Sequence, residues 1–277
     1  MFPHCTKRPR FLLAAFAPDN IRIIVRRLIV SGVAAALAFL PACRGTAPPQ
    51  PLSVAAAADL QFALAEGAAL FHRAHPETEV RVSYGSSGNF YAQIRNGAPF
   101  DLFLSADLQY PRKLVDEHAV REDSLFVYAI GRLAVWVPSA SALDPATALT
   151  DPAVHHLAIA DPQHAPYGRA AVAALHSMGI YDSLQGKLVL GENISQTLQF
   201  AQSGAADAGM VALSLAMAPN MRGQGRYWEV PVESYPKMVQ TGVILKDSAA
   251  AHRFREWLQG PAGRALLKRY GFSLPGE

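Results

Sequence analysis

The stretch Val82-Ser83-Tyr84-Gly85-Ser86-Ser87-Gly88-Asn89-Phe90 predicts the unit from which the fold is built: a strand, a glycine-bracketed turn and a helix. Apolar and polar residues alternate up to Tyr84, which is the period-two pattern of a half-buried strand. After the turn, Phe90 and Ile94 lie four residues apart, and Gly97 followed by Pro99 ends the helix.

Two serine hydroxyls and the free N–H groups of a helix start meet at this turn. Gly85 and Gly88 permit the tight backbone path that such a meeting requires. Unpaired N–H groups at a helix start, together with hydroxyls, form a site suited to an anion. The simpler alternative is an ordinary strand-to-helix turn with a serine N-cap, and this stretch alone leaves both open.

Strands alternate with helices through the rest of the chain, in two sets. A long β-rich segment at 124–138 is expected to leave one sheet and enter another, and a strand at 239–245 returns to the first. Two closing helices follow at 248–270. This order predicts an α/β fold with two mostly parallel sheets joined by two hinge crossovers. We expect one lobe from 52–133 and 238–277, a second from 134–237, and a cleft between them.

The net charge excludes one class of partner. The chain has 277 residues and a formal charge of +3, but residues 1–42 hold six basic residues and one acid. From Cys43 onward 19 basic residues face 21 acidic ones, a net of −2. A slightly acidic body gives no electrostatic footprint for nucleic acid. Apolar residues make up 51% of the chain, which is enough for a large core.

The N-terminal segment indicates export from the cytoplasm. Arg26 and Arg27 precede a short apolar run at 28–40, the pattern of a signal peptide at 1–42. Residues 1–24 are superfluous to this signal, and one hypothesis is that translation begins at Val25.

Cys43 marks the expected start of the mature chain. Leu40-Pro41-Ala42-Cys43 is similar to the bacterial lipoprotein box, although Pro41 departs from it, and plain secretion is the alternative to lipidation. Residues 43–51 form a proline-rich tether. Cys5 is the other cysteine of the chain, so the body has neither a disulfide of its own nor a cysteine–zinc site.

The body resembles the periplasmic molybdate-binding proteins of ABC importers, which have the type II binding-protein fold. The likeness covers everything after the tether, and five places carry it: AAAADL at 55–60, GSSG at 85–88 with AQI at 92–94, NGAPFDLFLSAD at 96–107, DPQHAPYG at 161–168 and GAADAG at 204–209. The run at 96–107 is the most specific of them.

The resemblance implies a protein that binds rather than catalyses. Its ligand would be molybdate or tungstate, held between the lobes of a monomer without a cofactor and delivered to the membrane permease of an ABC importer. The same resemblance places the protein in the periplasm, either free or anchored by a lipid on Cys43.

Matched position by position, the resemblance implies five ligand contacts. Ser87 corresponds to the family's hydroxyl ligand, and Tyr167 and Ile194 to positions that offer backbone N–H groups. Asp59, with Ala58 beside it, aligns with a ligand position that is serine or asparagine in other members. Ala212 stands where some members have a ligand tyrosine, which leaves a contact that the Tyr167 phenol could replace.

Asp59 is an unexpected residue at such a site, because a carboxylate a few ångströms from a dianion costs about 1 kcal/mol or more even when screened. Our hypothesis from the sequence is that Asp59 turns inward to cap its own helix. The N–H groups near 58–60 would then face the anion.

Other functions receive less support. A sensor or binding protein for another small oxyanion, such as sulfate, is the main alternative, and a scaffold module is a further one. A secreted serine hydrolase is less favoured, because residues 85–89 do not form the Gly-x-Ser-x-Gly elbow. His155, His156, His164 and His176 lack the spacing of the helical zinc motif, and no glycine-rich nucleotide loop occurs.

Overall fold

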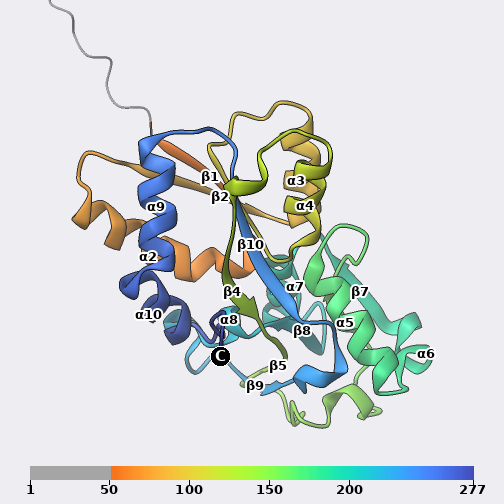
Figure 1. Ribbon diagram of the computed structural model, residues 1–277. Coiled ribbons are helices and arrows are strands. Elements are labelled where there is room, and N and C mark those ends of the chain that lie inside the picture. The colour runs from red at the N-terminus through yellow and green to blue at the C-terminus, as the bar shows by residue number, and fades with distance from the viewer. Residues whose placement is uncertain (1–50) are drawn as a thin grey trace, which may run out of the picture. The chain divides into compact units, whose positions relative to one another are not determined.

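The computed structural model describes residues 51–277 (Figure 1). The predictions on the signal peptide at 1–42, the translation start, the lipidation of Cys43 and the tether, apart from Pro51, lie outside the described residues. No helix within 51–277 combines the length and the apolar character that a bilayer-spanning segment needs.

The first sheet has the strand order β2-β1-β3-β10-β4. Its strands are β1 (Leu52–Ala57), β2 (Val80–Gly85), β3 (Leu102–Ser105), β4 (Leu125–Gly131) and β10 (Met238–Ile244). β2, β1 and β3 are parallel, whereas β10 runs antiparallel to both β3 and β4. β2 lies at the edge and alternates between half-buried and exposed residues, as its sequence predicts.

The second sheet has the order β7-β6-β8-β5-β9. Its strands are β5 (Leu133–Pro138), β6 (Leu157–Ala160), β7 (Leu188–Gly191), β8 (Ala208–Ala212) and β9 (Gly225–Glu229). β7, β6 and β8 are parallel, and β5 runs antiparallel to β8 and β9. The predicted two-sheet α/β architecture is confirmed, and the structure adds that each sheet is mixed. In each sheet the antiparallel strand is the one that enters from the other sheet without an α-helix before it: β10 in the first sheet and β5 in the second.

Helices lie on both sides of the central strands, which explains why every residue of β3, β6 and β8 is buried. Around the first sheet these are η2 (Ala58–Leu60), α2 (Gln61–Ala74), α3 (Ser87–Arg95), α4 (Gln109–Asp116), η3 (Glu122–Ser124), α9 (Ala249–Gln259) and α10 (Pro261–Arg269). Around the second they are η4 (Ala148–Thr150), α5 (Pro166–Ser177), α6 (Tyr181–Leu184), η5 (Gln185–Lys187), α7 (Ile194–Ser203), α8 (Leu213–Ala216), η6 (Pro219–Met221) and η7 (Val232–Ser234).

The side chains at the helix starts confirm the serine N-cap before α3 and contradict the cap expected at Asp59. Ser86 caps α3, and Asn193 caps α7 by accepting hydrogen bonds from two backbone N–H groups. Asp59 was predicted to cap a helix, and that prediction is wrong. It lies inside the short 3-10 helix η2, whose N-cap is Ala57, and its side chain caps nothing.

Two crossovers connect the sheets, and hydrogen bonds tie them together. The first is short, because only Arg132 separates β4 from β5, and the second runs through η7 between β9 and β10. The Leu133 N–H donates to the Tyr235 hydroxyl at 3.1 Å, and the Val230 N–H donates to the Leu133 carbonyl at 3.0 Å. In Figure 1, β4 and β10 run side by side from the first sheet toward the second. The lobe boundaries at 133/134 and 237/238 stay a prediction.

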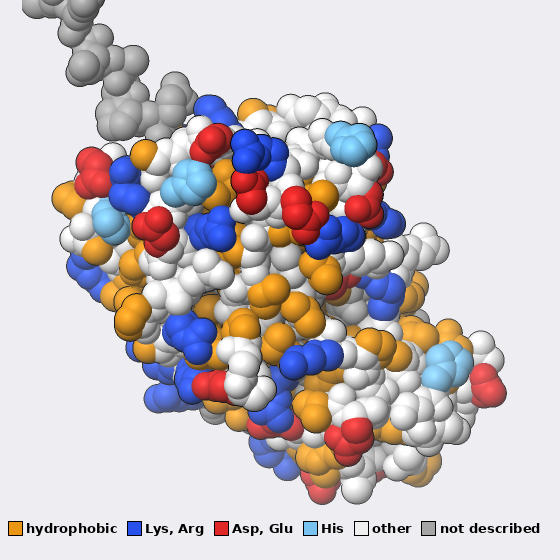
Figure 2. Space-filling model, in the orientation of Figure 1, with side chains coloured by type: hydrophobic (Ala, Val, Ile, Leu, Met, Phe, Trp, Pro, Cys, Tyr) orange, Lys and Arg blue, Asp and Glu red, His pale blue; other side chains and the backbone are white. Residues whose placement is uncertain are grey.

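On the face shown in Figure 2, basic and acidic side chains are interspersed over the surface. Exposed basic and acidic side chains of the described residues also pair with each other, as in Arg81–Glu79 and Arg121–Asp123. This distribution agrees with the small net charge of the body.

Gly168 gives a test of the packing that positions α5. A Cβ at this residue would lie 2.1 Å from the Ala160 carbonyl oxygen, so backbone would have to move. We expect Gly168→Ala to lower the free energy of unfolding by about 1–3 kcal/mol, the usual cost of overpacking. Urea denaturation measures the change. Gly186→Ala is the control, because a Cβ there meets nothing within 4 Å. Equal stability of the two variants would contradict the prediction.

Candidate functional site

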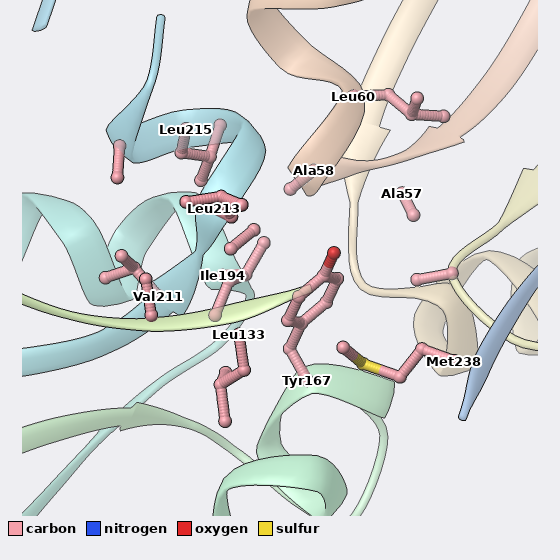
Figure 3. Close-up of a cluster of buried hydrophobic side chains, with 14 of the residues drawn as sticks. Ala57, Ala58, Leu60, Leu133, Tyr167, Ile194, Val211, Leu213, Leu215 and Met238 are labelled. Atoms are coloured by element: carbon pink, nitrogen blue, oxygen red, sulfur yellow. The ribbon is translucent and has the colours of Figure 1, made fainter. Parts of the chain in front are cut away.

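One cavity gathers all five residues that the sequence predicts as ligand contacts. It has an empty volume of about 190 Å³, open solvent included, and lies between the two sheets. The first sheet's side contributes Ala57, Ala58, Asp59, Gly85, Ser86, Ser87 and Ala106, and the second sheet's side Ala165, Pro166, Tyr167 and Ile194. In Figure 3 the Tyr167 phenol oxygen points toward the segment that carries Ala57 and Ala58.

Three helices begin at this cavity. Ser87 is the first residue of α3, Ile194 is the first of α7, and Tyr167 is the second of α5 after Pro166. Within residues 51–277 the backbone N–H groups of Ser87, Tyr167 and Ile194 have no hydrogen-bond acceptor. Helix N-termini carry partial positive charge, so their N–H groups favour an anion. The cavity lining includes no lysine, arginine or histidine.

The two adjacent serines, Ser86 and Ser87, have different hydrogen-bond partners. The Ser86 hydroxyl accepts a hydrogen bond from the Asn89 N–H at 3.3 Å as the cap of α3. The Ser87 hydroxyl accepts from the Ala106 N–H at 3.0 Å and donates to no acceptor among the described residues. Ser87 is fully buried and lines the cavity. Because neither its hydroxyl proton nor its backbone N–H has an acceptor among the described residues, both are available to a ligand there.

Asp59 is buried in a cluster of neutral polar groups. Its Oδ2 accepts from the Tyr167 hydroxyl at 3.2 Å and from the Gln240 amide nitrogen, whereas its Oδ1 has no partner within 51–277. The Tyr128 hydroxyl has one proton and two acceptors in reach, the Gln240 side-chain oxygen at 2.9 Å and the Ser105 carbonyl oxygen at 3.0 Å. The Gln240 amide nitrogen is on the side of Asp59. A Cβ on Gly131 would lie 2.6 Å from the Tyr167 hydroxyl, so glycine makes room for this cluster.

Burial raises the pKa of Asp59 from 3.8 to about 7. The hydrogen bonds from Gln240 and Tyr167, and the backbone N–H groups of Asp59 and Leu60, lower this pKa but are outweighed by burial. Burial also raises the pKa values of Tyr128 and Tyr167 well above 10, and the charge of Asp59 adds to both shifts. Both phenols therefore stay protonated near neutral pH and act as hydrogen-bond donors.

Contacts around the cavity join the two sides of the structure. The Gly88 N–H donates to the His164 carbonyl at 2.9 Å. The Ser195 hydroxyl lies 2.5 Å from the Gln61 side-chain oxygen and 3.1 Å from the Ala58 carbonyl oxygen, either of which can accept its proton. Arg169 donates to Asp107 at 2.5 Å. These contacts show that the two sides are closed against each other.

Part of the site was not predicted from the sequence. Gln240 and Tyr128 were not predicted to take part, although a glutamine inside the apolar strand at 239–245 was a usable signal. Ala212 is fully buried at the end of β8 and does not line the cavity. The Tyr167 phenol was expected to replace the ligand contact that a tyrosine at 212 would make. In the structure its hydroxyl proton goes to Asp59 and is not free for a ligand. Within 51–277 no group of three or more His, Cys, Asp or Glu side chains is placed to hold a metal ion.

Known proteins resemble this chain in both sequence and structure. The Molybdate-binding protein ModA of Rhodobacter capsulatus is 39% identical over 196 residues, which cover 70% of this chain and 77% of that protein. The Azotobacter vinelandii protein of the same name is 40% identical over 200 residues, covering 71% and 79%. The solved Azotobacter vinelandii periplasmic molybdate-binding protein aligns with a TM-score of 0.75 at 36% identity, over 81% of this chain and 99% of that one.

The profile of a family described as Bacterial extracellular solute-binding protein matches residues 52–273. That match spans both sheets and every residue that lines the cavity. The chain therefore belongs to the bacterial extracellular solute-binding protein family.

Proposed function

We propose that this chain captures molybdate, or the similar tungstate, in the cavity between its two sheets and delivers it to the membrane permease of an ABC importer. The observation that carries the proposal is the convergence of free N–H groups from α3, α5 and α7, with the Ser87 hydroxyl, on a cavity without a cationic side chain. The names of the relatives identify the anion as molybdate for those proteins.

A small set of neutral donors suits a tetrahedral dianion. Each N–H or O–H group can reach one oxygen at about 2.8–3.0 Å, and the helix ends supply partial positive charge without a cation. Donors lie on both sides of the cavity, so the bound anion favours the closed arrangement. The permease would then recognise that closed arrangement. The protein acts in this proposal as a monomer, with no catalysis and no resident cofactor.

The proposed location is the periplasm, where a lipid on Cys43 would anchor the chain to the membrane. Replacing Cys43 tests the anchor directly. We expect Cys43→Ala to move the protein from the membrane fraction to the soluble fraction of cells, as measured by immunoblotting. A wild-type protein found in the soluble fraction would leave plain secretion as the correct account.

The contacts of Ser86, His164 and Asp161 resemble a hydrolase triad, but their geometry disfavours that function. His164 Nδ1 lies 3.0 Å from the Ser86 hydroxyl, and His164 Nε2 lies 3.5 Å from Asp161. The serine oxygen, however, already accepts the Asn89 N–H as a helix cap, and the histidine–carboxylate distance exceeds a hydrogen bond. The contact joins the two sides of the closed structure instead.

Ser87→Ala tests the site itself. A hydrogen bond to a charged group is worth about 1.5–3 kcal/mol, so we expect molybdate to bind roughly 10-fold more weakly or worse. Calorimetric titration measures the dissociation constant, and the ligand-induced rise in melting temperature provides a second readout.

Ser139→Ala is the matched control for this test, because Ser139 is exposed on the second sheet's side and its side chain makes no hydrogen bond among the described residues. The Ser87→Ala variant also leaves the Ala106 N–H without its acceptor, so its stability is measured separately. Unchanged affinity in a folded Ser87→Ala protein would remove Ser87 from the site.

Anion size distinguishes the proposed ligand from the sulfate alternative. Molybdate and tungstate have nearly the same radius and should bind within a few-fold of each other. Sulfate is smaller, cannot reach every donor at once, and should bind at least about 10-fold more weakly for each donor it fails to reach. Parallel calorimetric titrations measure this ratio. Equal binding of sulfate and molybdate would favour a general oxyanion receptor.

A further inference from the structure

We propose that Asp59 binds the anion in its acid form, with a proton on Oδ1 that donates a hydrogen bond to the anion, so that each anion is captured together with one proton. This inference rests on the proposed function, and it adds a specificity-determining residue and a dependence on pH to that function.

The arrangement around Asp59 separates its two oxygens. Oδ2 already accepts from Tyr167 and Gln240, whereas Oδ1 has no partner among the described residues, although Asp59 lines the cavity and is 1% exposed. A buried polar atom without a hydrogen-bond partner costs free energy. Because Oδ1 lies at a cavity whose other polar groups are donors, we expect its partner to be an atom of the ligand. An ionised Oδ1 could only accept, and would repel an anion. A protonated Oδ1 donates, as every other polar group offered to the anion does.

The neighbours of Asp59 leave the proton without a competing charge. Its carboxyl group faces Tyr167 from α5, Gln240 from β10 and, at longer range, Tyr128 from β4, all neutral near pH 7. The backbone N–H groups of Asp59 and Leu60 from η2 also act on it, and they carry no net charge. Ser214 from α8 donates to the Asp59 backbone carbonyl. None of these groups is a cation that would hold the carboxyl group ionised. A pKa of about 7 agrees with this, since it makes the acid form readily available in the unliganded protein.

The predicted dependence of affinity on pH has a definite sign. Below about pH 6 Asp59 is already protonated, and the dissociation constant should not change with pH. Above the pKa of about 7, binding must take up a proton, so the dissociation constant should rise toward 10-fold per pH unit. Titration with molybdate from pH 5.5 to 8.5 measures this slope. Titration at pH 8 in buffers of different ionisation enthalpy counts the protons taken up.

Asp59→Asn provides the sharpest variant. The asparagine carbonyl can take the place of Oδ2 and accept from Tyr167 and Gln240, while its NH2 group takes the place of Oδ1 as a permanent donor. We expect the slope and the proton uptake to disappear, and the variant to bind molybdate about 10-fold more tightly than the wild type at pH 8.

His164→Asn is the matched control, because His164 is the titratable side chain that contacts Ser86 at the cavity. This variant should keep the slope and the proton uptake, whatever its effect on affinity. A slope lost with His164 and kept in Asp59→Asn would overturn the inference.

Unfolding of the unliganded protein gives an independent readout. The pKa of Asp59 is raised on folding, so its contribution to stability is present at low pH and is lost as pH rises from about 4 to 7. The urea midpoint of the wild type should therefore fall relative to Asp59→Asn over that range. Parallel midpoints would overturn the inference.

The outcomes separate this inference from the proposed function. Wild-type binding with no proton uptake, or weaker binding by a folded Asp59→Asn at every pH, would overturn the role of Asp59 and leave molybdate capture standing. The latter result would mean that an ionised Asp59 accepts a proton carried by the ligand. A wild type that binds no molybdate at any pH would overturn both.

Discussion

The hydrogen bond from the Tyr167 phenol to Asp59 joins the two sides of the structure inside the protein, and the site depends on it. Asp59 comes from the first sheet's side and Tyr167 from the second, and Gln240 from the return strand β10 completes the cluster. Because all three side chains are buried, water cannot compensate for a lost partner. The geometry of the cavity and the protonation of Asp59 are therefore determined together.

The helix starts explain how so small a cavity can serve an anion without a cation. Parallel strands end at one edge of each sheet, and the helices that follow them begin there with unpaired N–H groups. These edges of the two sheets lie on opposite sides of the cavity. The start of α3 therefore lies across the cavity from the starts of α5 and α7. Uncharged donors fixed by the backbone also lose little conformational freedom when a ligand binds, unlike long cationic side chains.

Local patterns in the sequence predicted much of this arrangement, because they are local in origin. Neighbouring residues determine the alternation in β2, the glycine turn before α3 and the Ser86 cap. The role of Asp59 does not. Its partner Gln240 lies 181 residues away, and the competition between capping a helix and joining a buried cluster is decided by tertiary packing. The sequence pattern therefore favoured a helix cap for Asp59. Nothing in the sequence around Tyr128 or Gln240 indicated that these side chains pair with it.

The balance between open and closed arrangements follows from the kinds of contact that join the two sides. Several contacts around the cavity involve exposed or half-exposed groups, such as Asn89 with Glu192 and Arg169 with Asp107, and each contributes little because water competes for the same groups. The buried bond from Tyr167 to Asp59 contributes more, but it leaves Oδ1 without a partner. An anion bound as proposed would satisfy the free N–H groups on both sides at once, and would add to the closure that the protein's own contacts support.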